Sequence, residues 1–242
     1  MELATEAIVI HTVKYSDNSL IVKLLSPGGV QSYMARGVQS KASKTPASVF
    51  SPLALLHIEA SLKKQGNAIS ILRSAAFAEP LYRSYARPAR QAILMFYAEV
   101  SYEVLKHDHH QEYAEIYDFL KESILELEHS EELPPALPLL FLVRLARLLG
   151  FGMLSDMPYE EPCFHLGEAR FIHYAAAMPE MLVQGRCARL LGQMLNEDRC
   201  PEGYTREERN ELLRKLVLYF QVHFHAGFRV QSHEILSVVL GA

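Results

Sequence analysis

Cysteine is scarce in this 242-residue chain, and its spacing argues against a disulfide framework. The three cysteines, Cys163, Cys187 and Cys200, are odd in number and far apart, which is typical of free thiols in a reducing cytoplasm. No run of about 18 apolar residues occurs, so a membrane-spanning helix is not expected. The first residues, MELATEAIVIH, lack the basic flank and cleavage site of a signal peptide. We therefore expect a cytoplasmic protein.

The sequence also lacks the short motifs of the commonest enzyme classes. It contains neither G-x-x-x-x-G-K-[ST], which cradles nucleotide phosphates, nor G-x-G-x-x-G, which binds dinucleotides. The metalloprotease motif H-E-x-x-H and the hydrolase motif G-x-S-x-G are absent as well. We therefore expect a protein that works by binding, without catalysis and without a cofactor.

What the sequence does contain is enough apolar material for one or two domains, because half of its residues are hydrophobic. Its net charge of −4 is unevenly distributed. Residues 1–80 contain eight basic and five acidic residues, a net charge of +3, so the remaining residues carry −7. This asymmetry indicates that the N-terminal part meets an anion and that the rest has another role.

Five segments of the first 80 residues are rich in β-branched and aromatic residues, and we expect each to form a strand. They are 6–15, 20–25, 31–36, 53–62 and 68–75. Gly-containing turns separate several of them, as in Pro-Gly-Gly before the third strand. Five short strands close most simply into a barrel, for which the OB-fold is the obvious candidate.

The connection between the third and fourth strands is the feature around which this region is organised. It lies within YMARGVQSKASKTPASVFSPLALLHIE, residues 33–59, and leads into an apolar strand expected over 49–58. Residues 39–48 contain small and polar side chains together with Lys41 and Lys44. Lysines on such a connection suit an extended polyanion, although a solvated loop is the plainer alternative.

Basic and aromatic residues of the expected barrel point to nucleic acid. OB-folds bind single strands through a cationic groove and stacking rings. The candidate rings are Tyr15, Tyr33 and Phe50, for each of which a place in the barrel core is the more ordinary interpretation. The candidate DNA-binding cations are Lys14, Lys23, Arg36, Lys41, Lys44, Lys63 and Lys64.

These residues resemble the N-terminal domain of the RecO family of bacterial recombination mediators. The resemblance rests on AIVIHTVKYSDNSLIVKLLS, YMARGVQSKASK and FSPLALLHIE, and Ala-Arg-Gly followed by Ser-Lys is its most specific part. It continues through AEPLYRSYARPARQAILMFYAEVSYEVL and FLVRLARLLGF, so it covers most of the chain.

The resemblance implies an OB-fold that binds single- and double-stranded DNA, followed by a helical domain. It implies a mediator that anneals complementary strands and, with RecR, loads the recombinase onto DNA coated by single-strand-binding protein. A location at the nucleoid follows, and neither a membrane nor a small-molecule substrate is implied.

From residue 81 the apolar pattern becomes helical. Apolar residues recur at helical intervals over 89–106 and over 111–128, and the second of these segments has an acidic outer face. A third helix, ending at Leu149 with Gly150 in the capping position, is apolar nearly all round and is expected to be central.

Further helices are expected towards the C-terminus. One should cover 179–196, and the next should begin at a capping box formed by Thr205 and Glu208. Ser232 should cap a last short helix over 235–240. The segment 155–175 is expected to be irregular.

Two groups of residues raise the question of a metal. The segment HDHH at 107–110 offers adjacent ligands, but a solvated connection between helices is the simpler interpretation. Some members of the resembled family bind zinc through two CxxC pairs, whereas here Cys163 stands near only His165 and His173. We expect no zinc, and expect that Phe164, Leu166 and Phe171 close this segment by apolar packing.

Arg144 and Arg147 lie three residues apart on the otherwise apolar third helix. They are expected either to pair with acidic residues such as Glu99 or Glu103, or to flank a groove that takes the acidic tail of single-strand-binding protein, which the resemblance implies as a partner.

The sequence thus predicts an α+β protein, with an OB-fold DNA-binding barrel at 1–80 and an all-helical domain for partner binding at 81–242. Two other functions stay open. The barrel could be a docking module of a protein adaptor that binds no DNA, or the histidines at 107–110 could serve a metal-dependent enzyme.

Overall fold

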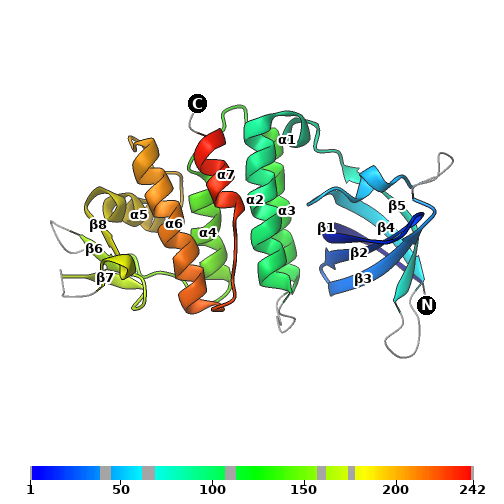
Figure 1. The fold of residues 1–242 in the computed structure, drawn as a ribbon, viewed down its shortest axis with the longest axis horizontal. Coiled ribbons are helices and arrows are strands. Elements are labelled where there is room, and N and C mark those ends of the chain that lie inside the picture. The colour runs from blue at the N-terminus through cyan, green and yellow to red at the C-terminus, as the bar shows by residue number, and fades with distance from the viewer. Residues whose placement is uncertain are drawn as a thin grey trace. The chain divides into compact units, whose positions relative to one another are not determined.

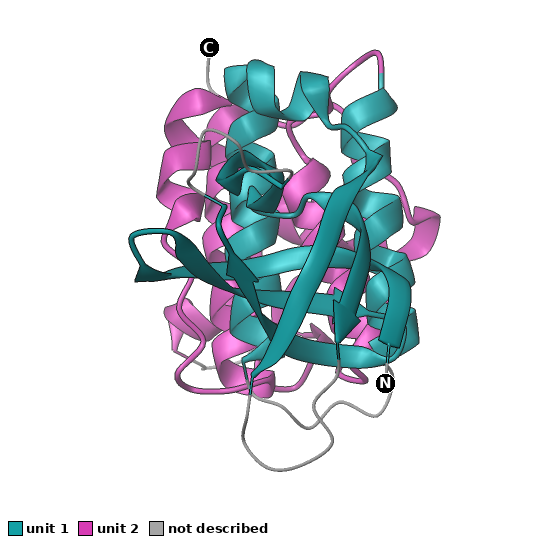
Figure 2. Ribbon diagram, turned by 90° about the vertical axis from the view of Figure 1, so that its right-hand side faces the viewer, with its two compact units in different colours: residues 1–130 teal, residues 131–242 magenta. Residues whose placement is uncertain are grey.

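The computed structural model describes residues 2–38, 45–61, 69–106, 113–156, 162–173 and 178–240. Their contacts divide the chain into two compact units, 1–130 and 131–242 (Figure 2). The first unit therefore contains three helices in addition to the barrel. Within the described residues, no helix is both long and apolar enough to cross a membrane.

The N-terminal strands close into an OB-fold barrel, which confirms the expected fold (Figure 1). Their order around the barrel is β1-β2-β3-β5-β4, and β4 returns to β1. The pair β3–β5 is parallel, and the other neighbours are antiparallel. The strands are β1 (Glu2–Ser16), β2 (Ser19–Ser26), β3 (Gly29–Arg36), β4 (Leu55–Ser61) and β5 (Ser70–Glu79).

Alternating apolar residues fill the barrel from every strand. Small residues such as Ala7 and Ala60 alternate with larger ones such as Val22 and Leu56, so the narrow interior is packed without a channel. Gly29 adopts a φ of +127° after the Pro27-Gly28 turn, a conformation that favours glycine.

The connection from β3 to β4 differs from the expected strand over 49–58. Ala47–Phe50 form a single turn of 3₁₀-helix, η1, and β4 begins only at Leu55. Val49 and Phe50 insert into the barrel core, where Phe50 is 2% exposed. Proline at 46 and 52 provides no N–H for a strand ladder, so these apolar side chains are buried by plugging the barrel instead of by pairing.

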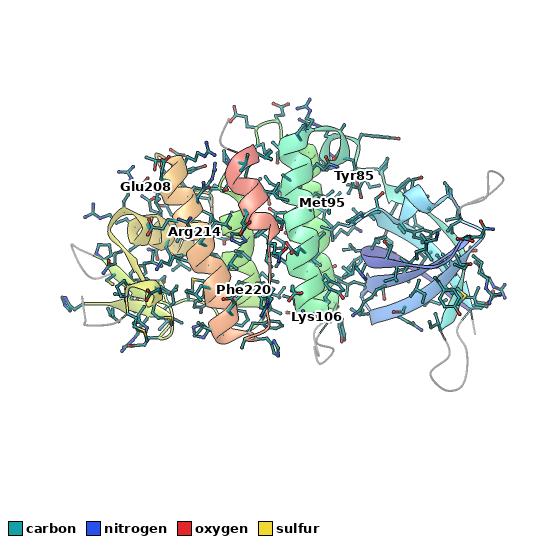
Figure 3. The ribbon with its side chains drawn as sticks, in the orientation of Figure 1. Tyr85, Met95, Lys106, Glu208, Arg214 and Phe220 are labelled. Carbon is teal, nitrogen blue, oxygen red and sulfur yellow. The ribbon has the colours of Figure 1, made fainter. Side chains whose placement is uncertain are left out.

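Three helices complete the first unit: α1 (Tyr82–Ala86), α2 (Pro88–Leu105) and α3 (Tyr113–His129). Sequence periodicity predicted α2 and α3 but missed the five-residue α1. The two long helices lie side by side, with α2 against β1 and α3 against β2 and β3 (Figure 1). The Tyr85 hydroxyl on α1 donates to the Pro52 carbonyl at 2.8 Å, which fixes α1 to the barrel (Figure 3).

The carboxylate of Glu6 joins β1 to α3. It accepts hydrogen bonds from Lys121 Nζ at 2.6 Å and from the Tyr117 hydroxyl at 3.0 Å, and His57 Nδ1 lies 3.9 Å away. The Lys121 and Tyr117 bonds lower the pKa of Glu6 below its usual range. Burial and the same carboxylate raise the pKa of Tyr117.

Two buried charged residues form hydrogen bonds with backbone groups at the end of α3 and the start of α1. Arg90, which is 2% exposed, donates to the carbonyls of Leu127 and Ser130 at the end of α3. Glu128 accepts from the amides of Arg83 and Ser84 at 2.9 and 2.8 Å, at the start of α1. Burial alone would raise the pKa of Glu128, but these amide bonds outweigh it and the pKa is lowered.

The second unit combines helices with a small sheet, which corrects the expectation of an all-helical remainder. Its helices are α4 (Leu137–Leu148), α5 (Gly185–Glu197), α6 (Arg206–His223) and α7 (Ser232–Val239). Its sheet has the order β7-β6-β8. The strands are β6 (Cys163–His165), β7 (Arg170–Ile172) and β8 (Leu182–Gln184).

The helix expected over 179–196 therefore begins later than predicted. Pro179–Met181 form a 3₁₀ turn, η2, and β8 precedes α5. Gly185, with a φ of +56°, turns the chain from β8 into α5 and prevents a continuous helix. The last helix, expected over 235–240 after a Ser232 cap, instead begins at Ser232, and Gln231 is its N-cap residue.

The expected signals at other helix ends are confirmed. Gly150 has a φ of +83°, and the bonds Gly150 N to Arg147 O and Phe151 N to Ala146 O form a Schellman motif after α4. Thr205 and Glu208 form both bonds of a capping box. α4 is buried along most of its length and packs against α5 and α6.

Glu6→Gln is expected to destabilise the first unit in a pH-dependent way. Because the pKa of Glu6 is lowered in the folded state, its stabilising effect is complete above the ordinary glutamate pKa of about 4.3 and is lost as the pH falls further. Thermal unfolding should show a lower midpoint for Glu6→Gln than for wild type at pH 7, and a smaller difference at pH 4. Equal differences at both pH values would contradict this. Glu122→Gln, on the exposed face of α3, is the control.

Arg90→Met is expected to lower the free energy of unfolding by about 2–3 kcal/mol, because it leaves two inward-facing carbonyls without a donor. Urea unfolding followed by circular dichroism measures the change. Arg87→Met removes the same charge at an exposed position and should change stability by less than about 0.5 kcal/mol. Equal losses in the two variants would refute the role of Arg90.

Candidate nucleic-acid interface

The strand register brings basic residues of three strands to one end of the barrel. Lys14 is paired with Leu20, Leu20 with Ala35, and Ala35 with Leu72. One residue further along lie Arg36 on β3 and Arg73 on β5. Lys14, Arg36 and Arg73 therefore come from separate strands to the same end.

The two basic connections begin at this same end. Val38, which follows β3, donates its amide to the Asn18 carbonyl in the β1–β2 turn at 3.2 Å. Ser61, the last residue of β4, is paired with Glu2 and Ile71. The predicted DNA-binding lysines of these connections lie outside the described residues: Lys41, Lys44, Lys63 and Lys64.

Arg36 ends β3 with an exposed side chain. Its Nε lies 3.3 Å from Met34 Sδ, and within the described part of the chain no carboxylate lies at ion-pair distance from it. Gly37, with a φ of +70°, then turns the chain away. The guanidinium charge of Arg36 is therefore available to an external anion.

Arg73 occupies a β-bulge, and sequence reasoning did not single it out. Glu59 is paired with Ser74 and Ala60 with Leu72, so Arg73 is the extra residue between them. A bulge re-aims the side chain that it carries, and here both Arg73 and Ser74 are exposed. Nε of Arg73 donates to Ser61 Oγ at 2.6 Å, and Nη1 lies 2.7 Å from Glu2 Oε1.

A hollow of about 110 Å³ opens between the two arginines. Parallel pairing of β3 with β5 stops at Ala35 and Leu72, which leaves the strands apart from that point. Apolar side chains line its base and polar ones its rim. The lining residues are Ala35, Arg36, Val38, Thr45, Phe50, Leu72, Arg73 and Ser74.

The remaining predicted cations of the barrel differ in their surroundings. Lys14 is exposed and lies 3.1 Å from Asp17 in the β1–β2 turn. Lys23 instead donates to the Leu105 carbonyl at 3.2 Å, at the last turn of α2 next to Lys106 (Figure 3). That carbonyl belongs to the negative end of a helix dipole, so Lys23 has a structural partner.

Of the three candidate stacking rings, only Tyr15 is exposed, at 61%. Tyr33 and Phe50 are 3% and 2% exposed and belong to the barrel core, so the plainer interpretation holds for both. The Tyr33 hydroxyl donates to Gln31 Oε1 at 3.0 Å, and burial raises the pKa of Tyr33.

In the second unit, Arg144 and Arg147 share the carboxylate of Asp198. Arg144 Nε and Arg147 Nη1 lie 3.2 and 3.6 Å from Asp198 Oδ1, and Arg144 also donates to the Asp198 carbonyl. Asp198 ends α5 in the left-handed region, with a φ of 49°. Arg147 keeps 55% of its side chain exposed.

The metal candidates do not form a site in the described residues, where no group of three or more potential ligands converges. The histidines at 107–110 lie outside those residues. Phe164 and Leu166 are fully buried, and Phe171 meets Phe164 edge to face at 5.1 Å, which confirms the expected apolar packing around Cys163.

Comparison with known proteins agrees with this architecture. Residues 1–81, which span the barrel, match the family model described as Recombination protein O N terminal. The chain is 28% identical over 247 residues to the DNA repair protein RecO of Christiangramia forsetii, with full coverage of both chains. It is 28% identical over 238 residues to that of Bacteroides fragilis, covering 96% of this chain and 97% of the relative. For Azobacteroides pseudotrichonymphae the identity is 26% over 245 residues, covering 97% and 98%.

The similarity to these relatives extends over the barrel and over the helical unit alike. With the closed five-stranded barrel and the helices that follow it, these matches support the RecO family for this chain.

Proposed function

We propose that this protein binds DNA at the Arg36–Arg73 end of its barrel and acts as a non-catalytic recombination mediator in DNA repair. The observation that carries the proposal is the pair of exposed arginines on β3 and β5 beside the hollow. OB-folds bind oligonucleotides with the β2–β3 face and with the β1–β2 and β4–β5 loops. The β1–β2 turn and both ends of the β4–β5 connection lie at this end of the barrel.

The chemistry of this end favours the DNA backbone over the bases. Guanidinium and ammonium groups neutralise phosphates and release counterions, a contribution that is independent of sequence and sensitive to salt. Backbone contacts leave the Watson–Crick edges free. A strand held in this way can still pair with a complementary strand, which supports an annealing activity.

The residues after the barrel are proposed to bind protein partners. Their net charge of −7 repels DNA and suits docking of proteins instead. We assign RecR and the C-terminal tail of single-strand-binding protein as partners, in keeping with the RecO family. Arg144 and Arg147 are the proposed contacts for that acidic tail, because Arg147 remains half exposed beside Asp198.

Charge reversal at the barrel end tests the DNA-binding proposal. Fluorescence anisotropy of a labelled single-stranded oligonucleotide should give a log–log salt slope of about −2 to −4 for wild type, as expected for roughly three to six neutralised phosphates. Arg36→Glu, and separately Lys41→Glu/Lys44→Glu, should remove most of the affinity. Arg214→Glu makes the same charge change as Arg36→Glu at an exposed position on α6 (Figure 3), and it should preserve the affinity.

The outcomes separate the two candidate functions. If wild type binds no DNA even at low salt, the barrel is a docking module and the protein-adaptor function takes precedence. If Arg214→Glu weakens binding as strongly as Arg36→Glu, only net charge matters and the barrel end is not the site.

Lys23→Gln is expected to affect stability more than DNA binding, because its ammonium is held by the Leu105 carbonyl. Loss of this charged hydrogen bond should lower the free energy of unfolding by about 1–2 kcal/mol. The change in log Kd for DNA should be less than about half of the change that Arg36→Gln causes. A larger loss of affinity than for Arg36→Gln would place Lys23 in direct contact with DNA.

A further inference from the structure

The hollow between β3 and β5 has the composition of a subsite for a single oxyanion. Arg36, Arg73, Thr45 and Ser74 are its polar lining residues, and none of the described lining residues is acidic. One carboxylate adjoins the lining, because the Ser74 hydroxyl donates to Glu59 Oε2 at 3.0 Å. Arginine presents a planar fork of donors that matches the oxygens of a phosphate. The apolar base, formed by side chains of the barrel core and of η1, holds these polar groups at the surface.

Glu2 already presents a carboxylate to one of these guanidinium groups. Its Oε1 lies 2.7 Å from Arg73 Nη1, while Arg73 Nε donates to Ser61 Oγ. The ladder pairs Glu2 with Ser61, and the bulge directs Arg73 towards both. Contact of Glu2 with Arg73 is therefore built into the register of three strands. Its carboxylate has the charge and the oxygen geometry that a phosphodiester would offer to the same fork.

The ion pair is suited to exchange. The side chains of Arg73 and Glu2 are 57% and 76% exposed, and exposed pairs contribute little stability because water and salt screen them. Arg36, on the other side of the hollow, makes no ion pair within the described residues and supplies an uncompensated positive charge. An incoming phosphate can therefore contact both arginines in exchange for the weakly held Glu2 carboxylate, while Glu59 keeps its hydrogen bond from the Ser74 hydroxyl.

We propose that the hollow binds one backbone phosphate of DNA and that Glu2 is its intramolecular competitor. This inference rests on the proposed DNA-binding function. It adds where a phosphate binds and which carboxylate lowers the affinity for that phosphate. In the free protein the Glu2 carboxylate binds Arg73 Nη1, while Arg73 Nε is bound to Ser61 Oγ. In the complex a phosphate replaces Glu2, and the released carboxylate takes up a cation from solution.

Anisotropy titrations of a labelled oligothymidylate with four variants test this exchange. Glu2→Gln should raise affinity about two- to fivefold, the range that release of an exposed ion pair allows, and should steepen the salt slope by up to about 0.7. Glu122→Gln changes the net charge equally at an exposed position on α3 and should raise affinity by less than about 1.5-fold. Arg73→Gln should weaken DNA binding. When Glu2→Gln is added to Arg73→Gln, it should raise the DNA affinity by no more than Glu122→Gln raises that of wild type.

Each result decides between the two proposals. If wild type binds DNA but Glu2→Gln behaves like Glu122→Gln, the competitor role of Glu2 is wrong and DNA binding stands. If the gain from Glu2→Gln persists in the Arg73→Gln background, Glu2 acts by general repulsion and the subsite is refuted. If wild type binds no DNA, both proposals fail. Thermal unfolding of every variant confirms that the comparison is made between folded proteins.

Discussion

Three residue pairs close the barrel of this protein, and the geometry of its proposed DNA site follows from them. Tyr33–Ala35 on β3 run parallel to Ser70–Leu72 on β5. Without this ladder both strands would be open edges, which are prone to pairing with other chains. The ladder ends immediately before Arg36 and before the bulge at Arg73. The same few bonds therefore complete the sheet, bring two arginines together and leave the hollow between them.

The basic residues of the first unit divide into structural and available ones, a division that net charge does not reveal. Arg90 and Lys23 donate to carbonyls at helix ends, and Lys121 is bound to Glu6. These side chains hold helices to one another or to the barrel. Arg36, Lys14 and Arg73 are exposed, and the ion-pair partners of Lys14 and Arg73 are solvent-exposed carboxylates. A polyanion can compete for the second group at little cost to stability, but not for the first.

Local sequence patterns predicted the elements well where periodicity is long enough. Alternating apolar residues located all five barrel strands, and glycine and capping residues located the ends of α4 and α6. Three-residue strands such as β6 and β8 are too short to show a period, so their region was expected to be irregular or helical. Val49 and Phe50 have the composition of a strand, and only closure of the barrel reveals that they plug it.

The candidate site was predictable only in part, for the same reason. Arg36 lies at the end of a clear strand, so the sequence placed it correctly. The importance of Arg73 depends on a bulge, which arises from the register between β4 and β5 and leaves no trace in local composition. Lys23 has the pattern of a surface lysine, and its helix-end partner is 82 residues away in the chain. Relations between distant segments decided each of these roles.

The anchoring of the β3–β4 connection has a consequence for the length that this connection can have. Ala47 donates its amide to the Val38 carbonyl at 3.0 Å, and Val38 itself is bonded to Asn18. The two ends of the intervening segment are thus held together by the barrel, independently of what lies between them. The entropic cost of closing a loop between fixed ends grows only with the logarithm of its length. Residues can therefore be inserted or deleted between 38 and 47 at small cost to folding, so the proposed DNA binding, and not the stability of the barrel, limits what this segment can contain.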